Sequence, residues 1–150
     1  MVASSLFPLA ALLLGLSALP AAAQPRNFTC AGAELLEDDV FAVPFTRASA
    51  GIEEAARTPL AAAAAVAREQ PQRLVCVLGY AAADEGGATT GQRLAASRAR
   101  AVADRLAAMG VERDRIRAEA RHASFMPRTR RNPWGGRSAI IVVLPEPVTP

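Results

Sequence analysis

"RLVCVLGY" (residues 73–80) has the pattern of a strand in the middle of a β-sheet. Leu74, Cys76 and Leu78 would face one side of that strand, and the two valines between them would face the other. Both sets are apolar, which is typical of a strand that is covered on both faces. This segment is therefore expected to lie at the centre of the sheet.

Upstream of this segment, the pattern predicts one strand and one helix. Residues 38–46, DDVFAVPFT, alternate as a strand does, and Pro44 places it near a sheet edge or a bulge because proline donates no ladder hydrogen bond. The helix is expected over residues 59–69, with Thr58 as its N-cap and Pro59 in its first turn.

Downstream, the pattern predicts a second helix and two more strands. The helix begins near Thr89, which stands three residues before Gln92 as in a capping box. It ends at Gly110, a residue that suits the left-handed position after a helix. A strand follows around Ile116, and residues 137–144, RSAIIVVL, form a last apolar strand that pairs with it as in a hairpin.

These elements occur in the order β-α-β-α-β-β. Helices that cross between strands, followed by a final pair of strands, predict an α/β (α+β) two-layer sandwich, with a mixed sheet and the helices on one face. The 150 residues allow one such domain. It is expected over residues 38–144, after a lead-in over 24–37 and before a disordered tail over 145–150.

The first 23 residues are expected to lie outside this domain. An apolar stretch runs from Leu6 to Leu19, and small residues follow it up to Ala23, which is typical of a secretory signal peptide over residues 1–23. A retained membrane anchor is the alternative, although the stretch is shorter than the ~20 residues that span a bilayer. Cleavage would leave a mature chain without a transmembrane span, in the periplasm.

Export would place the two cysteines in an oxidising compartment, where disulfides form. Cys76 lies in the apolar strand and Cys30 lies in the polar lead-in. Two interpretations stay open: a Cys30–Cys76 disulfide that attaches the lead-in to the sheet, or one buried and one exposed thiol. Two cysteines and one histidine do not provide the usual ligand sets of a metal site, so no metal or cofactor is expected.

All 17 basic residues are arginines, and they concentrate in residues 93–137. Such a basic half indicates an anionic partner. For an exported protein, an anionic lipid surface or a carboxylate-bearing cell-wall polymer fits better than nucleic acid, which is not expected as a partner. A solvated basic face without a partner is the alternative.

No set of nucleophile, base and orienting group is visible in the sequence. His122, the one histidine, follows Arg121 in a basic stretch, and no neighbour in sequence would orient it as a catalytic base. Gly86 and Gly87 lack the flanking residues of a phosphate-binding loop. The sequence therefore predicts a protein that is not an enzyme.

A binding site is expected where the strand over residues 73–80 ends, because open sheets bind ligands at that edge. Asp84 from the following loop and Arg98 from the second helix would complement a zwitterion, since they bind an ammonium group and a carboxylate respectively. Amides near Thr90 and Gly91 would add affinity for an anion. The alternative is an ordinary surface ion pair.

Several segments together resemble the C-terminal OmpA-like domain of peptidoglycan-associated outer-membrane proteins. The resemblance covers residues 38–144 and is most specific in the second helix. There the family's L-S-x-x-R-A motif corresponds to Leu94, Ala95, Arg98 and Ala99.

The resemblance implies a non-catalytic domain that holds the diaminopimelate residue of the peptidoglycan stem peptide. The family does so through an aspartate in a G-H-T-D loop and the arginine of L-S-x-x-R-A, which corresponds to Arg98. The aspartate position is occupied by Ala82, and Asp84 would replace it if the loop bulged by two residues. Arg137 is the arginine kept from the family's closing N-R-R-V-E-I. Together with the helix amides, the expected ligand-binding residues are Asp84, Arg98, Thr90, Gly91 and Arg137.

The expected function is therefore non-covalent association with peptidoglycan, in the periplasm near the outer membrane, without catalysis or a cofactor. The alternative is a degenerate copy of the fold that acts in protein–protein assembly at the envelope. The displaced aspartate favours that alternative, as does the basic loop over residues 128–137 with Trp134 as a candidate anchor.

Overall fold

The computed structural model describes residues 26–121 and 135–147 of the chain. The expected signal peptide over residues 1–23, His122 and Trp134 lie outside these residues. Within the described ranges, no helix is both long enough and apolar enough to cross a membrane.

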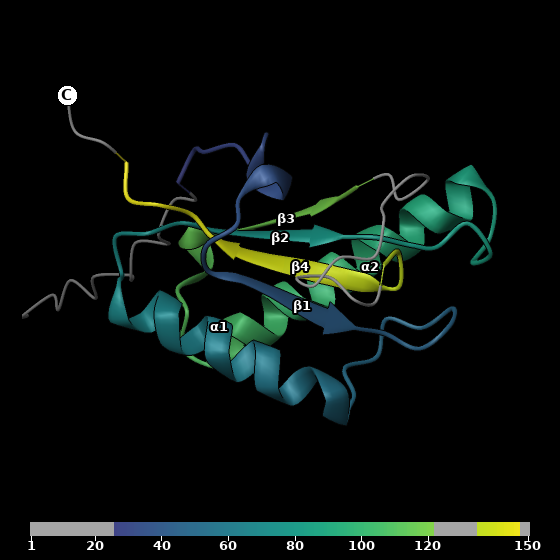
Figure 1. The fold of residues 1–150 in the computed structure, drawn as a ribbon, viewed down its shortest axis with the longest axis horizontal. Coiled ribbons are helices and arrows are strands. Elements are labelled where there is room, and N and C mark those ends of the chain that lie inside the picture. Colours follow the sequence, from purple (N-terminus) through teal and green to yellow (C-terminus); the bar gives the residue numbers. More distant parts are fainter. Residues whose placement is uncertain (1–25, 122–134, 148–150) are drawn as a thin grey trace, which may run out of the picture.

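Four strands form a mixed sheet in the described part of the chain (Figure 1). They are β1 (Val40–Pro44), β2 (Val75–Gly79), β3 (Ile116–Ala120) and β4 (Ser138–Val143), in the spatial order β1-β4-β2-β3. β4 runs antiparallel to both of its neighbours, whereas β2 and β3 are parallel. β2 is an internal strand and is buried along its whole length, as its two apolar faces predict. Pro44 lies on the edge strand β1, also as expected.

The expected hairpin of the last two strands is wrong. β4 does not pair with β3 but lies between β1 and β2. Burial explains the difference, because every residue of β4 is buried and such a strand belongs inside a sheet. The middle of β3 is exposed at Arg117 and Ala118, which suits an edge.

Two helices cover one face of the sheet (Figure 1). They are α1 (Arg57–Glu69) and α2 (Ala88–Ala108). A shared core joins them to the strands, and it includes Val43, Leu60, Ala64, Val75, Val77, Ala99, Val102, Leu106 and Ile141. The two-layer arrangement with a mixed sheet and both helices on one face is therefore confirmed.

The start of each helix differs from the predicted cap. A short 3₁₀ turn, η2 (Glu54–Ala56), runs directly into α1, so Thr58 is already inside the helix and is not its N-cap. α2 has Gly87 as its N-cap, and Thr89 therefore lies in its first turn. No side chain caps either helix.

The end of α2 is where the sequence predicts it. Gly110 has a φ of 95°, which is in the left-handed region that glycine tolerates. Its N–H donates to the carbonyl of Ala107, and the N–H of Val111 donates to the carbonyl of Leu106. These two bonds form a Schellman motif and turn the chain from α2 toward β3.

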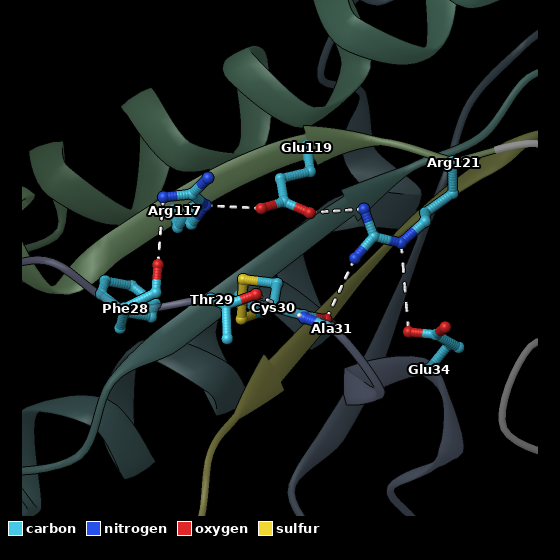
Figure 2. The surroundings of a disulfide bond; sticks show 9 residues. Phe28, Thr29, Cys30, Ala31, Glu34, Arg117, Glu119 and Arg121 are labelled. Atoms are coloured by element: carbon cyan, nitrogen blue, oxygen red, sulfur yellow. Dashed lines mark hydrogen bonds and ion pairs between the residues drawn. A yellow bond between two sulfur atoms is a disulfide. The ribbon is translucent and has the colours of Figure 1, made fainter.

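The lead-in covers the face of the sheet opposite the helices (Figure 2). A disulfide joins Cys30 to Cys76 of β2, so the disulfide interpretation of the two cysteines holds. Arg117 and Arg121 donate hydrogen bonds to the backbone carbonyls of Phe28 and Cys30, at 3.0 Å each. The lead-in is thereby a folded part of the molecule.

Candidate functional site

The candidate site lies at the carboxyl end of β2, where the strand packs closely against α2. A Cβ atom at Gly79 would lie 2.0 Å from the carbonyl oxygen of Ala95, so glycine alone fits this contact. The loop over residues 80–87 then crosses to the start of α2. This close approach brings the loop next to Arg98, which lies three residues after Ala95.

Arg98 and Glu85 form a buried, bidentate ion pair. Nη1 of Arg98 donates to Oε2 of Glu85 at 2.7 Å, and Nη2 donates to Oε1 at 2.6 Å. Both side chains have no exposed surface. The guanidinium fork matches a carboxylate in this geometry. The acid that faces Arg98 is thus Glu85, and not Asp84 as the sequence led us to expect.

The remaining N–H groups of Arg98 are also bonded within the chain. Nε donates to the carbonyl of Ser49, Nη1 to that of Tyr80 and Nη2 to that of Thr46, at 2.8, 3.0 and 3.1 Å. The guanidinium carbon lies 5.2 Å from the ring centroid of Phe45, within the range of a cation–π contact. All five donors of Arg98 therefore have acceptors inside the protein.

The Glu85 carboxylate accepts two further hydrogen bonds from the backbone. The N–H of Ala48 donates to Oε1 at 2.9 Å, and the N–H of Ala82 donates to Oε2 at 2.7 Å. Burial by itself would raise the pKa of Glu85, but the bonds from Arg98 and from these amides outweigh it and lower the pKa to about 2. The carboxylate is therefore ionised at physiological pH.

Asp84 lies at the surface and pairs with other arginines. Its Oδ2 is 2.5 Å from Nη2 of Arg137 and 3.9 Å from Nε of Arg47. Nε of Arg137 in turn lies 3.8 Å from Oε1 of Glu85. A row of alternating charges therefore runs from the exposed Arg47 to the buried Arg98. It brings Asp84 and Arg137 together, while Glu85 separates both of them from Arg98.

The two residues expected to offer helix amides differ. The N–H of Gly91 donates to the carbonyl of Gly87 at 2.8 Å, so it is already used within the helix. Thr90 is exposed and lies in the first turn of α2, where an N–H has no acceptor within the helix. Thr90 therefore keeps an amide that can meet an anion, and Gly91 does not.

The sequence pointed to Asp84 and did not identify Glu85, the acid that pairs with Arg98. One signal was available. Arg98 follows Ala95 by three residues and precedes Val102 by four, so it falls on the apolar stripe of α2 and is buried with that stripe. A buried arginine requires an acid that can reach inside, and glutamate extends one methylene further than aspartate.

Several solved structures share this fold. The OmpA-like domain of FopA1 from Francisella tularensis subsp. tularensis SCHU S4 has a TM-score of 0.59 and 18% identity, over 75% of this chain and 80% of that one. For the peptidoglycan-associated lipoprotein from Burkholderia pseudomallei, the TM-score is 0.57 and the identity 21%, over 68% of this chain and 88% of that one. For the periplasmic domain of Helicobacter pylori MotB, the TM-score is 0.55 and the identity 18%, over 68% of this chain and 70% of that one. These likenesses show the fold.

No curated protein matches the chain. The sequence profile of the OmpA family matches residues 44–140, from the end of β1 into β4. The matched segment contains Glu85 and Arg98 as well as both helices. Because it covers more than half of the 150 residues, the chain belongs to the OmpA family.

Proposed function

We propose that the protein is a non-catalytic domain of the cell envelope that associates non-covalently with peptidoglycan. Membership of the OmpA family supports this proposal, and so does the likeness to a peptidoglycan-associated lipoprotein and to a periplasmic MotB domain. The expected signal peptide over residues 1–23 would deliver the domain to the periplasm, close to the outer membrane.

One observation carries the proposal at the level of residues, namely the surface pair of Asp84 and Arg137. The two groups have opposite charges, and their side chains are 51% and 37% exposed. They lie at the carboxyl end of β2, the edge at which open sheets bind ligands. The pair complements a zwitterion such as the end of a stem-peptide diaminopimelate, whose ammonium group would bind Asp84 and whose carboxylate would bind Arg137. Thr90 would add an amide donor.

Arg98 and Gly91 have supporting roles in this proposal. Arg98 holds Glu85 and thereby positions the neighbouring Asp84 at the surface. Gly91 closes the first turn of α2 through its bond to Gly87.

Co-sedimentation with purified sacculi tests the proposal. The wild type should pellet, and Asp84→Ala and Arg137→Ala should each lose about ten- to a hundredfold in affinity, because a lost charged hydrogen-bond partner costs ~1.5–3 kcal/mol. Arg93→Ala removes the same charge at an exposed position of α2 and is the matched control. Equal pelleting of all variants would contradict the role of the pair. A wild type that stays in the supernatant would contradict the proposal itself.

A second candidate is a protein–protein assembly module of the envelope that does not bind peptidoglycan. The hydrogen bonds of Arg98 favour this candidate. The resemblance assigns this arginine to the ligand, but each of its N–H groups donates to an acceptor within the chain. Deleting residues 128–134 and comparing crosslinked partners in the periplasm tests this candidate. This candidate is supported if the wild type does not pellet with sacculi and the deletion variant loses a crosslinked partner. Unchanged partners would contradict it.

A further inference from the structure

Four N–H groups converge on one carboxylate at the carboxyl end of β2. Two belong to Arg98 and two are the backbone amides of Ala48 and Ala82, at distances of 2.6–2.9 Å. They come from three parts of the chain: α2, the connection after β1 and the loop after β2. We propose that they form a carboxylate-binding pocket that the protein fills with its own Glu85, so that the Glu85 loop (residues 83–87) competes internally with an external carboxylate.

The pocket offers more donors than Glu85 uses. Nε of Arg137 is buried and makes no hydrogen bond within the described residues, and it lies 3.8 Å from Oε1 of Glu85. That distance is too long for a hydrogen bond, and a buried N–H without an acceptor is costly. A carboxylate that is not tethered to the loop can move toward Arg137 and accept from it as well.

The walls of the pocket are held in place by Arg98 rather than by Glu85. Ala48 has a φ of 58°, in the left-handed region that costs an alanine ~1–2 kcal/mol, and its N–H points at the carboxylate. Arg98 fixes the chain on both sides of Ala48, because it donates to the carbonyls of Thr46 and Ser49. The donors are therefore preorganised by the guanidinium, and Glu85 occupies the place that they create.

The occupant is carried by a segment that otherwise lies at the surface. Within residues 83–90, Glu85 is the one buried residue. Two glycines follow Glu85: Gly86 has a φ of 110° and packs against the Thr90 side chain, whereas a Cβ at Gly87 would meet no atom within 4 Å. Asp84 adds ion pairs to partly exposed arginines, which contribute little to stability. Withdrawal of Glu85 therefore breaks few strong contacts outside the pocket.

The size of the occupant defines the class of ligand. Truncation of Glu85 to alanine removes one methylene and the carboxylate, a unit with the size and charge of acetate. The emptied pocket should accept small monocarboxylates, or a carboxylate at the end of a flexible chain, and should discriminate against chloride, which cannot match the guanidinium fork.

Thermal unfolding of Glu85→Ala in sodium acetate and in sodium chloride, at pH 7 and equal ionic strength, tests the proposal. Acetate should raise the Tm of the variant in a saturable way, and at a hundred times its Kd it should shift the folding equilibrium about 100-fold. The wild type and the control Arg93→Ala should show no acetate-specific rise, since their pocket is filled. The double variant Glu85→Ala/Arg98→Ala should show none either, because its fork is gone.

Equal Tm values of Glu85→Ala in the two salts would overturn the proposal, as would the same rise in the double variant. If Glu85→Ala remains unfolded in both salts, hydrogen exchange of Glu85→Gln decides instead. Loss of the charge should loosen the loop and speed exchange of the Ala48 and Ala82 amides at least tenfold, while the Gly91 amide inside α2 stays unchanged. Unaltered exchange at Ala48 and Ala82 would overturn the proposal. No peptidoglycan enters these measurements, so their outcome is independent of the sacculus assay.

Discussion

Buried arginines hold the connections of this small domain together. Arg73, Arg98 and Arg115 are at most 7% exposed. Arg73 donates to the carbonyl of Leu144, and Arg115 donates to the carbonyls of Arg73 and Ala67. A planar guanidinium carries five N–H groups and can therefore satisfy several buried carbonyls at once. Part of the arginine content of the chain is structural, which its net charge of +3 does not reveal.

Replacement of Arg98 should strongly destabilise the protein. Arg98→Ala leaves the Glu85 carboxylate buried without its charged partner, and breaking a buried pair in this way costs ~3–5 kcal/mol. Arg100→Ala removes the same charge at an exposed position of α2 and should change the free energy of unfolding by no more than ~0.5 kcal/mol. Urea unfolding of both variants measures the difference. Similar losses in the two variants would contradict the structural role of the pair.

Acid should destabilise the protein through Glu85. Burial raises the pKa of this carboxylate, and the bonds from Arg98 and the Ala82 and Ala48 amides lower it, to about 2 against an ordinary 4.5. The unfolded chain therefore binds the proton more readily, so the stabilisation is complete above pH 4.5 and is lost as the pH falls toward 2. The loss is on the order of 3 kcal/mol. Glu112 and Glu119 also have lowered pKa values, so Glu85→Gln should keep part of the acid loss. Urea unfolding across this range should show a larger loss in the wild type than in Glu85→Gln, and parallel profiles would contradict the role of Glu85.

At the scale of elements, the site depends on how closely β2 approaches α2. Helix residues Ala95 and Ala99 are small, and Gly79 ends the strand against them without a side chain. The loop that carries Glu85 can reach Arg98 because the two elements touch at this point. The L-S-x-x-R-A resemblance therefore reflects packing, since Ala95 and Ala99 flank the arginine on the buried stripe.

Two glycine substitutions, one at this contact and one near the start of α2, should have opposite effects. Gly79→Ala would place a Cβ atom 2.0 Å from the Ala95 carbonyl oxygen and should cost ~1–3 kcal/mol or more, because one of the two backbones must move. Gly91→Ala would place a Cβ atom on α2 with its nearest neighbours at 3.9 Å. This substitution should stabilise the helix by up to ~1 kcal/mol. Thermal unfolding measures both. A neutral Gly79→Ala would show that the contact is looser than the structure has it.

At the scale of the whole molecule, the sheet is covered by two unlike layers. Helices α1 and α2 cover one face, and the irregular lead-in covers the other (Figures 1 and 2). The second layer has little regular structure to hold it, apart from the 3₁₀ turn η1 (Ala33–Leu35). The covalent bond between Cys30 and Cys76 attaches it instead, together with Arg117 of β3 and Arg121 just after that strand.

Removal of the disulfide should release the lead-in. The bond closes a loop between residues that are 46 positions apart, for which the chain-entropy relation gives a loss of about 4 kcal/mol. Cys30→Ala/Cys76→Ala should therefore unfold at a lower temperature than the oxidised wild type, and the amide of Ala33, which donates to the carbonyl of residue 30, should exchange faster. Dithiothreitol should lower the Tm of the wild type and leave that of the double variant unchanged. Equal Tm values of the two proteins would contradict the stabilising role.

The sequence predicts most of the fold but only part of the site. Strands and helices are recognised because their apolar periods are local, and Gly110 marks a helix end by its own backbone preference. The place of β4 was missed because its pairing with β1 and β2 joins segments far apart in the chain. The choice between Asp84 and Glu85 was missed because it depends on which side chain enters a pocket built by three separate segments.

The sequence by itself therefore determined the elements, the mixed sheet with helices on one face, and the resemblance to the OmpA-like domain. The tertiary structure decided which strand lies between which, that Cys30 and Cys76 are joined, and that Arg98 is buried against Glu85 while Asp84 stays at the surface. The physical reason is one of range. Periodicity and caps act between residues a few positions apart, whereas ion pairs, disulfides and strand order depend on distances that exist only once the chain has folded.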